Sequence, residues 1–170
     1  MKLTRATILC AAACGPTRGP IVVPHFVGTW SADDQQRVVD GSGVWDQLGF
    51  GGAPSSALPE CRRQWYLAPK TTQCKITVEV SRQTMDQLFV GDETTSAVAD
   101  QDHRTVIIDP KWHGWDLLAI AAHEFGHILL DSHHLAPGKI GVMQAKGALW
   151  TPTQDDYDLA CSTIKICIHP

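Results

Sequence analysis

Two stretches of the chain have the hydrophobic pattern of β-strands. Residues 75–81 place an apolar side chain at every second position, which is the period of a strand with one buried face. Residues 104–108 are mostly apolar, and the Asp-Pro pair that follows them ends the strand. A further strand is expected at 25–30, whereas residues 83–89 fit neither a strand nor a helix clearly.

The first helix is expected to begin at Ser31. Its hydroxyl can accept a hydrogen bond from the first turn, and Asp33 and Asp34 follow where acidic side chains favour the helix dipole. We expect this helix to continue to about Leu48, although two glycines each weaken it by about 1 kcal/mol relative to alanine. The apolar side chains that it would bury are Val38, Trp45 and Leu48.

Two more helices are predicted in the second half of the chain. Residues 115–130 form an almost unbroken apolar helical pattern that also contains two histidines and a glutamate. Because ionisable groups in a core need partners, this combination indicates a functional helix. A last helix begins within 153–156, where a threonine and two aspartates precede apolar positions. Residues 53–72 and 91–102 are predicted to be loops.

Composition limits the kinds of protein that the chain can be. It has 170 residues, of which 44% are hydrophobic and 19% charged, and this is typical of one globular domain. The net charge of −4 leaves no basic footprint, so nucleic acid is not an expected partner. No apolar run approaches the roughly 20 residues that a membrane-spanning helix needs.

The N-terminus has the features of a bacterial export signal. Lys2 and Arg5 precede a short apolar stretch at 6–13, and Cys14 follows three alanines. This arrangement resembles a lipoprotein box, in which the cysteine is lipidated and becomes the first residue, so we favour a lipid anchor at the cell envelope over plain secretion. The predicted organisation is a signal peptide at 1–13, a linker at 14–24 and a single domain at 25–170.

Four cysteines follow the N-terminal segment. An even number in an exported chain suggests two disulfides. Three pairings are open, of which we favour the local ones, Cys61–Cys74 and Cys161–Cys167. A zinc site built from thiolates is the alternative, but the chain contains no C-x-x-C pair.

Residues 123–127, His-Glu-Phe-Gly-His, supply the pattern H-E-x-x-H within the predicted helix at 115–130. On a helix, His123 and His127 are one turn apart on the same face, close enough to share a metal ion. Glu124 lies about 100° around the helix, where a general base is needed to take a proton from a metal-bound water. Catalytic zinc usually has three protein ligands, and His133 or His134 can complete the set.

At this point the chain resembles the metzincin metalloproteases, most closely their matrixin-like bacterial members. Gluzincins take their third ligand from a later glutamate, and no glutamate follows Glu124. The resemblance covers most of the predicted domain. The motifs that carry it are a first helix with Trp45, the run 107–109 followed by Trp112, the H-E-F-G-H pattern, Val142-Met143 as the Met-turn, and residues 153–156 at the start of the last helix.

The resemblance implies an α+β fold in which a small twisted sheet packs with an active-site helix and a C-terminal helix. It also implies one catalytic Zn²⁺ held by His123, His127 and His133, with Met143 beneath the histidines as an apolar floor. A structural Ca²⁺ is compatible with the resemblance but is assigned no residues. The chain is expected to be a monomer.

One position departs from the family pattern H-E-x-x-H-x-x-G-x-x-H. Leu130 stands where the family has glycine, at the point where the active-site helix ends and the chain reverses. If the helix ends there, Leu130 must adopt a left-handed conformation that costs roughly 1–2 kcal/mol. If the helix continues and turns at Asp131, His134 would reach the zinc instead of His133. The spacing from His127 favours His133, and both alternatives remain open.

The expected activity is zinc-dependent hydrolysis of peptide bonds in a peptide or protein substrate, with Glu124 as the general base. The strand that ends near Ile108, or the one before it, is expected to pair with extended substrate. The alternative from another class is a non-catalytic exported binding protein that keeps a zincin fold. The glutamate favours the enzyme, because a structural zinc would not need that carboxylate.

Overall fold

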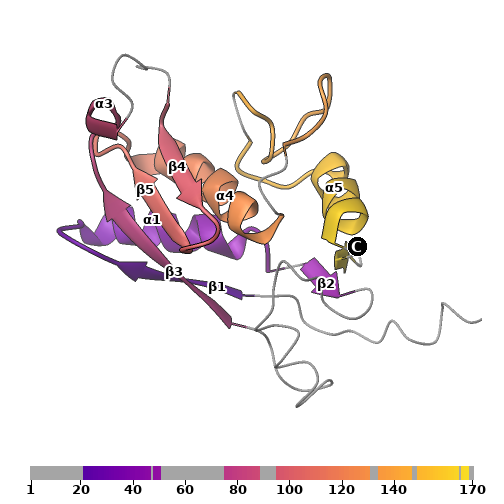
Figure 1. The fold of residues 1–170 in the computed structure, drawn as a ribbon, viewed down its shortest axis with the longest axis horizontal. Coiled ribbons are helices and arrows are strands. Elements are labelled where there is room, and N and C mark those ends of the chain that lie inside the picture. The colour runs from indigo at the N-terminus through magenta and orange to yellow at the C-terminus, as the bar shows by residue number, and fades with distance from the viewer. Residues whose placement is uncertain are drawn as a thin grey trace, which may run out of the picture.

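The computed structural model describes residues 21–46, 48–50, 75–88, 95–130, 134–146, 149–164 and 166–168. Within this part of the chain a four-stranded mixed sheet packs with helices, which is the predicted α+β class (Figure 1). The predicted signal peptide, Cys14 and the pair Cys61–Cys74 lie outside the described residues. No helix in the described ranges is both long enough and apolar enough to cross a membrane.

The sheet has the strand order β1-β3-β5-β4. Its strands are β1 (Ile21–Phe26), β3 (Lys75–Arg82), β5 (Thr105–Ile108) and β4 (Ala97–Asp100). The first three run parallel, and β4 pairs antiparallel with β5, with Ala99 opposite Val106. β4 is therefore an outer strand of the described sheet.

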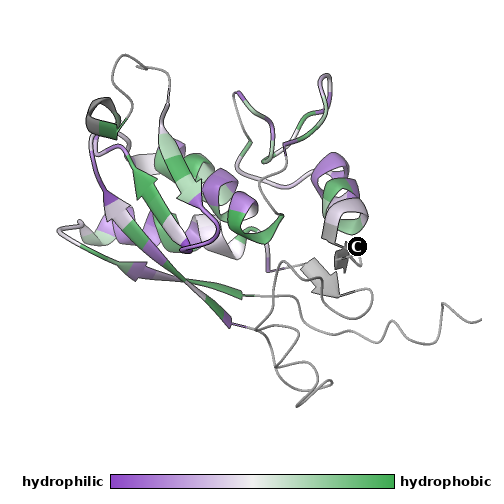
Figure 2. Cartoon of the chain, in the orientation of Figure 1, coloured by the Kyte–Doolittle hydropathy of each residue, from purple (hydrophilic) through white to green (hydrophobic). Residues whose placement is uncertain are grey.

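Strand β3 confirms the alternation predicted for residues 75–81. Hydrophobic and hydrophilic residues alternate along it (Figure 2). Ile76, Val78 and Val80 are fully buried, and the residues between them are exposed. Burial of each such side chain contributes roughly 1.5–3 kcal/mol, so this period determines which face of the sheet packs on the helices.

Two strands of the four-stranded sheet lie wholly or partly where the sequence indicated none. β1 starts inside the predicted linker and overlaps the strand expected at 25–30 only at its end. It includes Pro24, which an outer strand tolerates because the missing N–H is not needed on its open side. β4 lies within 91–102, which we predicted to be a loop. It has four residues, two of them alanines, and is too short for its own pattern to reveal it.

Helix α1 (Ala32–Gly43) begins at the predicted cap, where Ser31 Oγ accepts a hydrogen bond of 3.1 Å from Asp34 N. The helix ends at Gly43 and not near Leu48, because the two glycines weaken its last turn. Trp45 is fully buried in the turn that follows, as expected, although it is not on the helix.

Helix α4 (Gly114–Leu129) confirms the helix predicted at 115–130 and lies beside α1 on one face of the sheet (Figure 1). The two helices pack tightly at Gly41, where a Cβ would lie 2.8 Å from the carbonyl oxygen of Leu118. Trp45 joins them by donating a hydrogen bond of 2.8 Å from Nε1 to the carbonyl oxygen of Ala122. These contacts fix the part of α4 that precedes the histidines.

A largely buried ion pair holds the segment between β5 and α4. Arg82, at the end of β3, lies 3.0 Å from the carboxylate of Asp34 and donates hydrogen bonds to two carbonyl oxygens, including that of Trp112. His113, which precedes α4, contacts the same carboxylate at 3.0 Å. Burial alone would raise the pKa of Asp34, but the hydrogen bond with His113 and the charge of Arg82 hold this pKa below its usual value.

The remaining elements lie outside the four-stranded sheet. A short helix, α3 (Met85–Leu88), occupies the stretch at 83–89 that the sequence left ambiguous. Helix α5 (Gln154–Ile164) begins where the last helix was predicted, and β6 (Ile166–Ile168) pairs antiparallel with β2 (Leu48–Phe50).

The thiol of Cys161 on α5 is free in the structure, which contradicts the predicted Cys161–Cys167 disulfide. The prediction relied on the short spacing between the two cysteines. However, α5 ends and β6 begins between the two cysteines. In β6 the backbone of Cys167 pairs with that of Gly49 on β2. The two cysteines therefore belong to elements with different partners.

Candidate metal centre

Helix α4 brings His123 and His127 together, as their spacing predicted. Their imidazole rings are 4.7 Å apart between centroids, and the two Nε2 atoms are 3.1 Å apart. Both side chains are half-buried, on the face of α4 that looks into a cleft.

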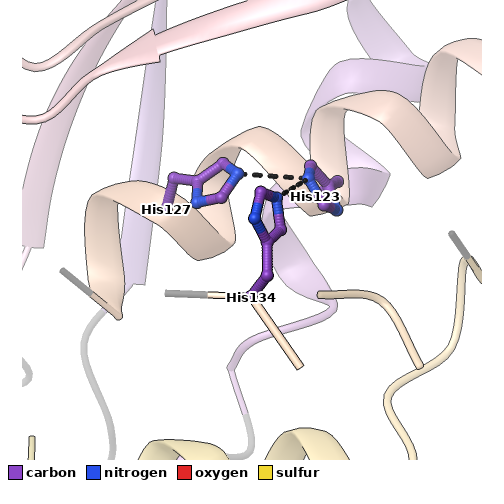
Figure 3. Close-up of side chains that lie close together, drawn as sticks. All are labelled: His123, His127 and His134. Carbon is purple, nitrogen blue, oxygen red and sulfur yellow. Dashed lines mark hydrogen bonds between the residues drawn. The ribbon is translucent and has the colours of Figure 1, made fainter. Parts of the chain in front are cut away.

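His134 supplies the third imidazole of the cluster. Its Nε2 lies 3.2 Å from Nε2 of His123, and one nitrogen of each of the three rings lies within 4.8 Å of the others (Figure 3). Two nitrogen ligands that are each about 2.05 Å from a tetrahedral zinc are about 3.3 Å apart. The observed separations therefore fit a metal ion held by three imidazoles.

His133, which the sequence favoured as the third ligand, lies outside the described residues. The structure brings the alternative ligand, His134, into the cluster, although α4 ends at Leu129 and Asp131, where the alternative placed the turn, lies outside the described residues. Leu130 N still donates a helical hydrogen bond of 2.7 Å to the carbonyl oxygen of Gly126. Its φ of −109° is not left-handed, which corrects the strained turn that we expected. Leu130 is also fully buried, so glycine at this position would remove core packing without relieving strain.

The hydrogen bonding and burial of the histidines suit metal binding. His123 Nδ1 lies 2.7 Å from the carbonyl oxygen of Val142. A carbonyl oxygen can only accept, so Nδ1 bears the proton and the lone pair of Nε2 points into the cluster. Burial lowers the pKa of His123 and lowers that of His127 to about 3. Both rings are therefore neutral near pH 7, which is the form that binds a metal.

Met143 lies against the helix between the two histidines. It is fully buried, and a Cβ added at Gly126 would overlap its sulfur and approach the ring of Trp45 to 2.8 Å. Only glycine leaves room for the thioether at this point of α4. The sequence placed Met143 beneath the histidines as an apolar floor, and the packing at Gly126 agrees with that position.

Asp156 holds the turn that contains Val142 and Met143. This fully buried carboxylate accepts hydrogen bonds of 2.9 Å from the backbone N–H of each residue, and one of 2.8 Å from Thr153 N. A Cβ at Gly141 would overlap the carboxylate. Helix α5 thus positions the Val142 carbonyl that orients His123. Sequence reasoning assigned Asp156 only to the start of the last helix.

We expect Asp156→Asn to destabilise the protein by roughly 2–4 kcal/mol, because an amide nitrogen would face a buried N–H donor. Zinc affinity should also fall, by about tenfold, because the carbonyl that orients His123 loses its support. Thermal unfolding and zinc titration measure the two effects. Asp155→Asn is the control, since Asp155 forms an exposed pair with Lys139 at 2.7 Å, and exposed pairs contribute little to stability. Equal effects of the two substitutions would contradict this role for Asp156.

Glu124 is directed toward the outer strand β4 and is not a member of the histidine cluster. It is 8% exposed and accepts a hydrogen bond from the backbone N–H of Ala99. Burial raises the pKa of its carboxyl to about 8. A divalent cation beside it would favour the ionised form and lower this pKa. The side chain is thus placed to accept a proton next to the three imidazoles.

The histidines and Glu124 open onto a cleft of about 910 Å³. One wall is a face of α4 that contains Asp116, Ala119 and Ile120, and another is formed by residues 95–99 in and before β4. Residues 144–146, directly after Met143, form a further part of the lining. The sequence did not reveal this wall of β4, because the strand was predicted as a loop.

This arrangement can hold a divalent metal with an open coordination position, next to a buried carboxylate and at the edge of a sheet. Such a combination is suited to metal-assisted hydrolysis. No protein-family model matches the chain, and a search of curated proteins finds no match.

Proposed function

We propose that this chain is a zinc-dependent endopeptidase of the metzincin type. The observation that carries the proposal is the convergence of three imidazoles, from His123, His127 and His134, beside Glu124 in an open cleft. A metal site with a purely structural role would be closed and would need no buried carboxylate beside it. The donor set of three imidazole nitrogens suits zinc better than magnesium or calcium, which prefer oxygen ligands.

In the proposed reaction, Glu124 acts as the general base and then as the general acid. When bound, zinc would supply Lewis acidity that polarises the scissile carbonyl and lowers the pKa of water. Glu124 takes one proton from the attacking water while the water oxygen bonds to the carbonyl carbon. The C–N bond then breaks, and Glu124 passes the proton to the leaving amine nitrogen. The products are a carboxylic acid and an amine, so atoms and charges balance.

The proposed substrate is an extended polypeptide that lies along β4. β5 occupies one side of this strand, and its other side borders the cleft, where Ala99 N–H already donates to Glu124. An extended peptide can add to such an edge through main-chain hydrogen bonds. That pairing would bring a scissile carbonyl to the histidine cluster and Glu124 together.

A chelator experiment tests the proposal. The purified chain should contain about one zinc per molecule and should cleave a generic unfolded protein into peptides. A strong chelator should abolish cleavage, and added Zn²⁺ should restore it after the chelator is removed. Zinc is measured by atomic absorption and cleavage by mass spectrometry of the products. Cleavage that continues unchanged in metal-free protein would refute a zinc peptidase.

A further inference from the structure

Four large exposed apolar side chains form a patch on the first turn of α4 and on the segment that precedes α5. We call it the tryptophan patch, and it consists of Trp115, Ile140, Leu149 and Trp150. Trp115 is 60% exposed, Trp150 is 55% exposed and Ile140 is 59% exposed. Single exposed apolar residues are ordinary, but several in one place usually mark an interaction site.

Contacts between separate segments join the members of this patch. The rings of Trp115, in the first turn of α4, and Trp150, before α5, are 5.7 Å apart between centroids. Leu149 N donates a hydrogen bond of 3.2 Å to the carbonyl oxygen of Gly141, the residue after Ile140. The guanidinium of Arg37 lies 4.3 Å from the centre of the Trp115 ring. This cation–π contact holds Trp115 in place before any partner binds.

The tryptophan patch is next to residues that line the cleft, although none of its four members lines the cleft itself. Trp115 directly precedes Asp116, which lines the cleft on α4. Lys146 also lines the cleft, and Trp150 follows it four positions later in the sequence. The contact between the two tryptophans joins the start of α4 to the segment before α5. A chain that leaves the cleft past Asp116, toward the start of α4, would pass next to the tryptophans.

The distance along α4 indicates which part of a substrate would arrive there. His123 is eight positions after Trp115 in the sequence. At a rise of 1.5 Å per residue this is about 12 Å along the helix. An extended peptide covers about 3.3 Å per residue. The tryptophans are therefore three or four substrate residues away from the scissile bond.

We propose that the Trp115–Trp150 pair is a substrate subsite that binds a bulky apolar side chain three or four residues from the scissile bond. This inference rests on the proposed peptidase function and adds to it a class of preferred substrate. Indole rings suit this role, because they offer a large, rigid apolar surface with few rotamers to fix.

Peptide binding to the zinc-loaded chain with Glu124→Ala, which prevents turnover, tests the subsite. The bond that the parent cleaves is first located by mass spectrometry. A series of labelled peptides is then made around this bond. Each peptide has leucine, tryptophan or serine at one position, and this position is varied from two to five residues from the bond on either side. Fluorescence anisotropy gives Kd. We expect leucine or tryptophan at the third or fourth position on one side to tighten binding by about tenfold relative to serine.

Substitution of either tryptophan by alanine should remove this tenfold gain, and Trp150→Phe should retain most of it. Val39→Ala is the matched control, because Val39 is 42% exposed on α1 and is not a member of the patch. A gain that persists in both alanine variants overturns the subsite. Sedimentation with phosphatidylglycerol vesicles tests whether the patch binds lipid instead. The subsite is overturned if the alanine variants bind all peptides as the parent does but, unlike the parent, no longer sediment with the vesicles.

The same measurements separate this inference from the proposed function. If the parent cleaves and binds peptides but shows no preference that depends on the tryptophans, only the subsite is wrong. If the parent neither cleaves nor binds any peptide, both proposals are wrong.

Discussion

Replacing Glu124 with alanine should leave one zinc bound per chain and lower the rate of peptide hydrolysis by about 10²–10⁴-fold. The metal should remain, because Glu124 does not belong to the cluster formed by His123, His127 and His134. The rate should fall because no other carboxylate among the described cleft residues lies beside the histidines. Asp116 also lines the cleft, but it is seven residues before His123 on α4, about two turns away.

Zinc content and hydrolysis of one defined peptide, measured on the same preparation, decide this prediction. Glu79→Ala is the control, because Glu79 is an exposed residue of β3 on the far side of β5 from β4. Its rate should equal that of the parent. A Glu124→Ala protein that cleaves as fast as the parent would show that the mechanism is wrong. Loss of zinc from this variant would show that the Glu124 carboxylate contributes to zinc binding, although it is not a member of the histidine cluster.

Sequence periodicity predicted the elements whose own residues determine their structure. Residues 75–81 alternate because one face of β3 is buried, and residues 115–130 are helical and largely buried for the length of α4. The positions of His123 and His127 followed from this helix alone, because residues four apart on a helix face the same way. The local cap at Ser31 was predictable for the same reason.

Elements that depend on a distant partner were not predictable. β4 is a strand because β5 pairs with it, and its four residues contain no period of their own. Pro24 indicated a linker, yet β1 tolerates it at an outer position of the sheet. The sequence placed the end of α1 too late. Trp45 is buried in the turn beyond the helix, and in the sequence a buried residue of a turn has the same apolar character as a buried residue of a helix.

The candidate site shows the same division between local and distant causes. Asp156 is thirteen residues beyond Met143 in the sequence, and only the fold shows that its carboxylate accepts hydrogen bonds from the Val142–Met143 turn. The small residue at 141 was a usable signal, because a side chain there would overlap that carboxylate. The third ligand depended on where the chain leaves α4, and there Leu130 is fully buried with a φ of −109°, which the spacing of the histidines did not indicate.

His134→Ala should lower zinc affinity by at least about a hundredfold, whereas His133→Ala should bind zinc nearly as the parent does. Loss of a residue that only orients a ligand already costs about 10–100-fold in affinity, so loss of a ligand should cost at least as much. His134 Nε2 is 3.2 Å from His123 Nε2, and the three-imidazole cluster is complete without His133. Competition with a chromophoric chelator at fixed pH gives both affinities.

The comparison of these neighbouring histidines is informative because both substitutions remove the same imidazole group from the same segment. A general effect of losing an imidazole would appear in both variants, whereas loss of a ligand should appear in one. Absorption of the Co²⁺-substituted protein should show a changed coordination sphere in His134→Ala only. If His133→Ala is the variant that loses zinc, the chain must reverse earlier after α4 than the position of His134 indicates. The ligand spacing would then be that of the metzincin pattern, in spite of Leu130.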